Sequence, residues 1–155
     1  MSNARERLLI LETEGKFLFH GSPLLLKELI PKQLVNFDRK TGEKSKDGNP
    51  AVAATQFVDI AIFRAIVNPR NFPFGKGYGS SFGMTPEGNI RLEITQKTWE
   101  HLQGKMGYVY VLPRQGFSPF RSWDWRSERE VVPLGVITVS AEDLPTEKIQ
   151  VRDWI

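Results

Sequence analysis

Hydrophobic runs along the chain are short, and turn-forming residues separate them. The run at 16–20 has three apolar residues between Lys16 and His20, and it predicts a buried strand. The Ser-Pro pair at 22–23 has the residue types of a helix N-cap and a first helical position, so a short helix is expected from there to Ile30. His20 and Gly21 would therefore lie at a corner between a strand and a helix.

The next part of the chain changes from polar to apolar. Residues 31–50 are polar and rich in turn formers, and they predict a long surface loop. The small residues of AVAAT (51–55) predict a strand. Thr55 is then in place to cap a helix over 56–67, because the apolar positions of QFVDIAIFRAIV keep a helical spacing. Pro69 would end this helix.

The second half of the chain predicts further short elements after a glycine- and aromatic-rich loop. They are hairpin strands at 82–84 and 89–95, a helix over 95–104, a strand at 107–113, a strand or pair of strands over 129–140, and a last turn opened by Ser140 and Asp143. This order, without regular βαβ spacing, predicts an α+β fold with a mostly antiparallel sheet. At 155 residues, one domain over 1–155 is expected.

Composition narrows the chemistry without choosing a function. The chain has no cysteine, which excludes disulfides, thiolate metal sites and a cysteine nucleophile. His20 and His101 are the only imidazoles and the acids are scattered, so no metal site is predicted. The sequence contains neither an apolar run of about 20 residues nor a signal-peptide pattern, so a cytoplasmic protein without a membrane partner is expected. A net charge of +3 is only weak support for a nucleic-acid partner.

Three segments then stand out: FLFHGSP at 17–23, AVAAT with FVDIAIFRAI at 51–66, and SEREVVPL at 127–134. Together they resemble the core of the ADP-ribosyltransferase fold, the superfamily of diphtheria-toxin-like and poly(ADP-ribose)-polymerase-like enzymes, of which the chain would be a divergent member. The resemblance implies a split, mostly antiparallel β-sheet core with short helices. It also implies that the protein uses NAD as a substrate.

The resemblance assigns NAD-binding roles to particular residues. It implies that His20 hydrogen-bonds a ribose, that Gly21 pairs with the nicotinamide amide through its backbone, and that Ser22 completes the motif. The second strand lacks the family's tyrosine, so Phe63 would supply one aromatic face for nicotinamide, and Tyr78 or Phe82 the other. Thr55 is a further candidate for binding the cofactor. Arg64 or Arg70 could contact the pyrophosphate of NAD.

Glu128 and Glu130 are the candidate catalytic residues that the resemblance implies. Cleavage of the bond between nicotinamide and ribose passes through an oxocarbenium-like state, which a nearby carboxylate stabilises. The Glu-Arg-Glu pattern resembles arginine-specific transferases, whereas members with the histidine motif use one glutamate. Glu130 is favoured because it directly precedes the apolar run.

Each of these residues also has a structural interpretation, and several functions remain open. The histidine could be a satisfied, partly buried residue, Phe63 a core residue, and the two glutamates solvated positions on an edge strand. The main hypothesis is transfer of ADP-ribose from NAD to a macromolecular acceptor, protein or nucleic acid. The alternatives are a catalytically silent binding module and an NAD-dependent enzyme that removes a 2′-phosphate from RNA.

Overall fold

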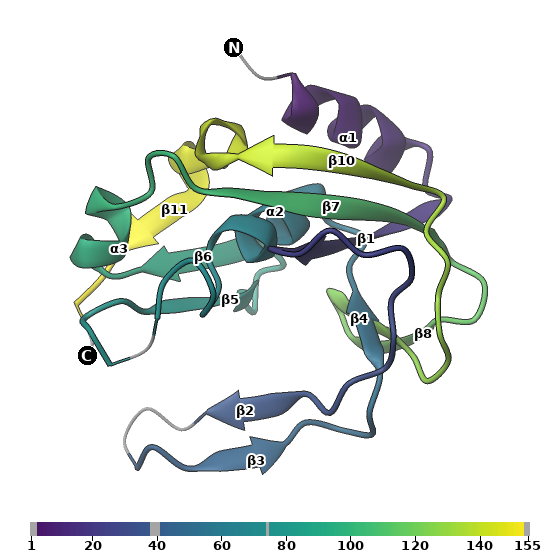
Figure 1. Cartoon of the computed structure of the whole chain (residues 1–155), viewed down its shortest axis with the longest axis horizontal. Helices are drawn as coiled ribbons and strands as arrows, with labels where there is room; N and C mark the ends of the chain where they lie inside the picture. The colour runs from purple at the N-terminus through teal and green to yellow at the C-terminus, as the bar shows by residue number, and fades with distance from the viewer. Residues whose placement is uncertain (1–2, 38–40, 74, 154–155) are drawn as a thin grey trace.

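The computed structural model describes residues 3–37, 41–73 and 75–153. They form short strands and short helices that are joined by loops (Figure 1). The helices are α1 (Ala4–Thr13), α2 (Val58–Ile66), α3 (Gln96–Glu100) and the 3-10 turns η1 (Ala141–Asp143) and η2 (Thr146–Lys148). The strands are β1 (Phe17–Ser22), β2 (Val35–Phe37), β3 (Lys44–Lys46), β4 (Val52–Ala54), β5 (Ser80–Met84), β6 (Ile90–Ile94), β7 (Met106–Pro113), β8 (Ser118–Arg121), β9 (Asp124–Ser127), β10 (Gly135–Ser140) and β11 (Ile149–Val151).

The centre of the fold is a split sheet whose halves meet between β1 and β4. One half has the order β1-β7-β10, the other has the order β4-β9-β8, and all their pairings are antiparallel. Phe19 and Thr55 join the halves by exchanging backbone hydrogen bonds of 2.7 and 2.9 Å. Within the described residues this bridge is the only pairing of β1 with β4. The predicted α+β class with mostly antiparallel pairing is confirmed.

Helix α2 lies against one face of the split sheet and is buried almost completely. Eight of its nine residues are buried, and the exception is Arg64. The helix approaches β1 and β7 closely because both strands carry a glycine where they meet it. A Cβ on Gly21 would lie 1.9 Å from the Ala61 carbonyl oxygen, and one on Gly107 would lie 2.1 Å from the Ala65 carbonyl oxygen. Gly21 is therefore required by packing, whatever else it does.

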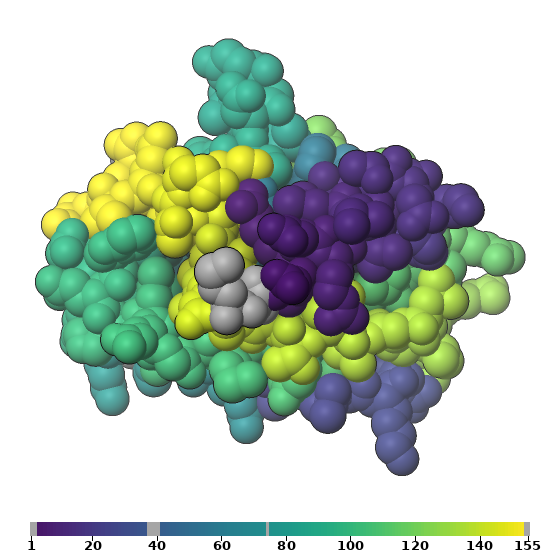
Figure 2. Space-filling model, turned by 90° about the horizontal axis from the view of Figure 1, so that it is seen from above, coloured from purple at the N-terminus to yellow at the C-terminus, as the bar shows by residue number. Residues whose placement is uncertain are grey.

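Helix α1 and the C-terminal segment are fastened to α2 through one buried carboxylate. Arg5 donates two hydrogen bonds to Asp59, of 2.9 and 3.0 Å, and Lys148 donates a third of 2.6 Å. These bonds lower the pKa of Asp59 although burial alone would raise it. Figure 2 shows α1, in purple, lying on the upper surface beside the yellow C-terminal segment. The sequence analysis did not predict α1 or β11.

The predicted helix from Ser22 to Ile30 is wrong, because distant partners hold this segment in a non-helical conformation. The hydroxyl of Tyr110 accepts a 2.6 Å hydrogen bond from the Leu26 amide and donates one of 2.6 Å to the Leu24 carbonyl. Leu29 exchanges two 2.9 Å backbone bonds with Val131. Ser22 is consequently the last residue of β1 rather than a helix cap.

Other predictions were confirmed in part. The hairpin β5–β6, helix α3 with its Thr95 cap, strand β7 and the capping box of Ser140 with Asp143 are present. Helix α2 is also present, but its N-cap is Phe57, and its first free amide is satisfied by Glu12 of α1, at 2.7 Å from Val58, rather than by Thr55. The predicted loop 31–50 contains the hairpin β2–β3, and its residues 38–40 lie outside the described residues. Strands β8 and β9 form a further hairpin over 118–127.

Replacing Gly21 by alanine tests the close packing of α2 on β1. The added methyl meets backbone atoms of Ala61 and Ala65 that cannot move independently, so Gly21→Ala should lower the free energy of unfolding by about 1–3 kcal/mol or more. Gly135 in β10 provides a matched control, because a Cβ there meets nothing within 4 Å. Urea denaturation of the two variants checks this, and equal stabilities would contradict it.

Candidate functional site

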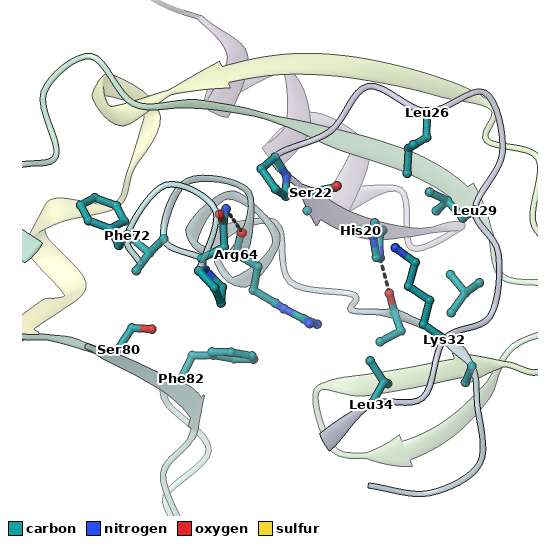
Figure 3. A pocket seen from close by; sticks show the side chains of 18 of the residues that line it. His20, Ser22, Leu26, Leu29, Lys32, Leu34, Arg64, Phe72, Ser80 and Phe82 are labelled. Carbon is teal, nitrogen blue, oxygen red and sulfur yellow. Dashed lines mark hydrogen bonds between the residues drawn. The ribbon is translucent and has the colours of Figure 1, made fainter. Parts of the chain in front are cut away.

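A cavity of about 350 Å³ opens where β1 and β4 diverge (Figure 3). Its walls come from the end of β1, the segment after it, strand β4, the last turn of α2 and the start of β5. The residues that line it include His20, Gly21, Ser22, Leu29, Lys32, Leu34, Arg64, Asn68, Tyr78, Ser80 and Phe82. The cavity is therefore built from segments that are far apart in the sequence.

The backbone of Gly21 faces this opening. Phe19 directs both its N–H and its C=O to Thr55, and in an antiparallel strand the residue two positions further directs its groups to the same side. The N–H and C=O of Gly21 accordingly point away from β7 and toward the gap between β1 and β4. A continued ladder would have paired Gly21 with Ala53. The strands diverge instead, and the glycine backbone lines the cavity.

His20 takes the hydrogen bond that a continued ladder would have made. Its Nδ1 lies 2.6 Å from the carbonyl oxygen of Ala53. Since a carbonyl can only accept, Nδ1 carries the proton. The pKa of His20 is lowered to about 4, mainly by burial; the hydrogen bond to Ala53 opposes this effect, and the charges of Arg64 and Lys32 add to it. At neutral pH the ring is therefore uncharged, with its Nε2 lone pair available as an acceptor.

Aromatic rings form the wall opposite His20. Tyr78 packs edge-on against Phe72, with ring centroids 5.3 Å apart, and its ring also receives the Lys97 ammonium at 4.6 Å. Phe82 packs edge-on against Trp123 at 5.2 Å. Both Tyr78 and Phe82 line the cavity, which gives it two rings on which a flat ligand group could pack.

The cavity carries positive and no negative side chains among its lining residues. Lys32 and Arg64 both line it, and no aspartate or glutamate from the described part of the chain does. Polar groups that are not charged come from Ser22, Ser80 and Asn68. The electrostatic character of the walls therefore favours an anionic ligand.

Most of the residues considered for NAD binding line the cavity, and Phe63, Thr55 and Arg70 do not. Those that line it are His20, Gly21, Ser22, Arg64, Tyr78 and Phe82. The Phe63 side chain is fully buried in the core and does not line it, although its ring lies 6.3 Å from that of Phe82. Thr55 is also buried, where its backbone bridges to Phe19 and its hydroxyl accepts a 3.1 Å bond from the Phe57 amide.

Neither candidate catalytic glutamate lines this cavity. Glu128 accepts a 3.3 Å hydrogen bond from Asn49 and borders a second hollow, which shares Ala51 with the cavity. Glu130 is exposed. It precedes Val131, whose backbone pairs with that of the lining residue Leu29, so Glu130 lies one residue away from a strand bridge at the cavity wall.

Several lining residues were not singled out by the sequence. Lys32 and Leu34 belong to the segment that was predicted to be a surface loop, and they reach the cavity because Lys32 pairs with Ala51. Arg64 was one of two basic residues considered for the pyrophosphate. One feature of the sequence could have singled out Arg64: it is the only charged residue among the last seven residues of α2, 60–66.

A metal site, a membrane-spanning helix and known relatives are three further features that could indicate a function. No cluster of three or more histidine, aspartate or glutamate side chains that could hold a metal ion occurs within the described ranges. No helix in the described part of the chain is long and apolar enough to cross a membrane. The sequence matches no protein-family model, and comparisons with curated proteins and with solved structures found no similar protein.

The lowered pKa of His20 predicts a pH dependence of stability. Because the unfolded histidine titrates near 6.5 and the folded one near 4, the contribution of the neutral ring is complete above pH 6.5 and is lost as the pH falls toward 4. The loss should reach at most about 3 kcal/mol. His20→Asn keeps a donor for Ala53 but does not titrate, so its stability should change less over this range.

Urea denaturation at intervals between pH 7 and pH 4 measures this dependence. His101→Asn is the matched control, because His101 is exposed and its ring bonds only locally, to the Lys97 carbonyl at 2.8 Å. The carboxylate Asp47, with a pKa lowered to about 2, titrates below this window and should not obscure the result. If the stability of the parent and that of His20→Asn depended on pH with the same slope, His20 would not be the group responsible for the loss of stability.

Proposed function

We propose that this protein binds NAD in the cavity at the split of the sheet, as an ADP-ribosyltransferase-like domain. The observation that carries the proposal is that His20 and Gly21 present an acceptor nitrogen and a free-facing backbone edge to one cavity, opposite two aromatic rings. The split, mostly antiparallel sheet, which the family resemblance implies, also supports it.

Each group of the cavity has a role in holding the dinucleotide. The Gly21 N–H and C=O are complementary to a carboxamide, which has one acceptor and a pair of donors, so they would pair with the nicotinamide amide. The Nε2 lone pair of His20 would accept a hydrogen bond from a ribose hydroxyl. Tyr78 and Phe82 would pack on the nicotinamide ring, in the place that the sequence had assigned to Phe63.

ADP-ribosyl transfer requires a further carboxylate, for which Glu130 is the proposed source. In the reaction the bond between the nicotinamide nitrogen and C1′ of the ribose breaks, and its electron pair leaves with nicotinamide. The acceptor atom forms a bond to C1′ and releases its proton. A carboxylate stabilises the positive charge that develops on the ribose between these events. Glu130 would have to approach the ribose from the strand bridge of Val131 with Leu29.

A second candidate function is a binding module that holds NAD or ADP-ribose without turning it over. The placement of the acidic residues favours it, because none of the described residues that line the cavity carries a carboxylate and Glu128 is engaged by Asn49. This candidate shares the binding site with the first, so measurements of binding and of turnover distinguish them.

Calorimetric titration with NAD tests the binding site that both candidates share. Ser80 is exposed at the start of β5 and lines the cavity, so Ser80→Trp should fill it while the strand remains intact. We expect NAD to bind the parent protein and Ser80→Trp to weaken binding at least about tenfold, or 1.4 kcal/mol. Ser118→Trp, at an exposed position of β8 outside the cavity, should bind as the parent does. Absence of binding to the folded parent would refute the proposal.

Release of nicotinamide from NAD tests whether the bound dinucleotide is cleaved. If Glu130 is catalytic, Glu130→Gln should retain NAD binding and lower turnover on the order of 100-fold, because it removes charge and keeps shape. Glu142→Gln makes the same charge change at an exposed position of η1 and should have no effect.

The acceptor is identified in the same assay by adding cell extract or RNA with a 2′-phosphate. Label retained on protein or nucleic acid supports transfer of ADP-ribose, and loss of the 2′-phosphate supports the RNA-processing alternative. Binding of NAD with no turnover under any of these conditions would establish the silent module and contradict the transferase.

A further inference from the structure

Arg64 is a partly buried arginine whose guanidinium has no hydrogen bond and no ion pair among the described residues. It projects from the last turn of α2 into the cavity, between His20 and Phe82 (Figure 3). Its guanidinium carbon lies over the Phe82 ring, 5.1 Å from the ring centroid. A ring face steadies a guanidinium but satisfies none of its five N–H donors.

The nearest acids are already used by other arginines. Asp124 is the carboxylate that attracts Arg64 through space, but it accepts hydrogen bonds of 2.7 Å from Arg121 and 2.9 Å from Arg126. Asp47 also bonds to both of those arginines, at 2.5 and 2.7 Å. The group therefore contains two carboxylates and three guanidinium ions, and the charge that remains without a partner is that of Arg64.

A partly buried cation without a counterion is unfavourable, and the position of Arg64 in the cavity indicates which ligand would relieve it. Burial lowers the pKa of Arg64, which shows that its charge is held where water solvates it poorly. Lys32 adds a second positive group to the same walls, and Ser80 and Asn68 add polar ones. A guanidinium fork matches two oxygens of a phosphate, and that pairing strengthens where water is excluded.

We propose that Arg64 is the phosphate-binding residue of the cavity, which therefore selects ligands that carry a diphosphate group over the corresponding nucleosides. This inference uses the cavity of the proposed function and names the part of the ligand that Arg64 holds. It does not depend on nicotinamide or on any turnover, because inorganic pyrophosphate and ADP carry the same group.

The position of Arg64 gives the ligand an orientation in the cavity. Phe82 contacts the guanidinium on one side, and Gly21 and His20 lie at the end of β1 on the other. A dinucleotide with its diphosphate on Arg64 could then place one ring near Tyr78 and Phe82 and a ribose hydroxyl at His20. The diphosphate is thus the group from which the two halves of the ligand diverge.

Titration calorimetry with inorganic pyrophosphate, ADP and adenosine tests the inference on the full chain. The parent should bind pyrophosphate and ADP, and bind adenosine at least tenfold more weakly than ADP. Arg64→Gln should weaken the binding of ADP and pyrophosphate at least tenfold and leave adenosine unchanged. Arg64→Lys should have an intermediate effect, because it keeps the charge and loses the fork. Arg7→Gln, an equal charge change at an exposed position of α1 outside the cavity, should bind as the parent does.

Thermal unfolding without ligand separates this role from a purely structural one. A phosphate-binding arginine without a partner should not stabilise the empty protein, so Arg64→Gln should melt at or above the temperature of the parent. Equal binding of pyrophosphate by the parent and by both Arg64 variants would overturn the inference. So would an early-melting Arg64→Gln together with an Arg64→Lys that binds pyrophosphate as the parent does.

The same titrations show which proposal fails if one does. ADP and pyrophosphate binding that depends on Arg64, with no binding of NAD, would refute the proposed function and support this inference. NAD binding of equal strength in the parent and in Arg64→Gln would refute this inference and leave the proposed function in place.

Discussion

The hydrogen bond from His20 to the carbonyl of Ala53 is the interaction on which the cavity depends. It joins the residue directly after Phe19 to the residue two positions before Thr55, at the carbonyl that a regular ladder would have paired with Gly21. By satisfying the Ala53 carbonyl with a side chain, the protein leaves the strands apart without an orphaned buried acceptor. The same bond fixes the proton on Nδ1 and leaves Nε2 as an acceptor. One contact thus opens the sheet and sets the chemistry of its opening.

Packing of α2 on the other side of β1 holds this opening in place. Gly21 and Gly107 let the helix approach the strands closely, so the last turn of α2 is near enough for Arg64 to reach the cavity. The Gly21 position is therefore constrained twice: its missing side chain admits the helix, and its backbone faces the gap. A histidine-glycine pair at the end of a strand has a structural reason and a binding reason here, and these do not exclude each other.

Local sequence patterns predicted the elements that are held by hydrogen bonds between neighbouring residues. They failed where residues that are distant in the sequence determine the backbone conformation. Thr95 and the pair of Ser140 with Asp143 mark turns that their own side chains close, and these were predictable. The residues after Ser22 have helix signals, yet Tyr110, more than 80 positions away, binds their backbone and prevents a helix. His20, Gly21, Ser22 and Tyr78 could be predicted at the site. Arg64 could not be ranked above Arg70, because nothing in the sequence shows which acids are already engaged by Arg121 and Arg126.

A long-range proton–nitrogen correlation spectrum of the histidine rings measures the central interaction directly. The account predicts that His20 is neutral at pH 7 with its proton on Nδ1, that it begins to titrate only near pH 4, and that its Nε2 resonance shifts when NAD is added. The only other histidine, His101, can be assigned by substitution. A His20 ring that titrates near pH 6.5, or that carries its proton on Nε2, would contradict the account.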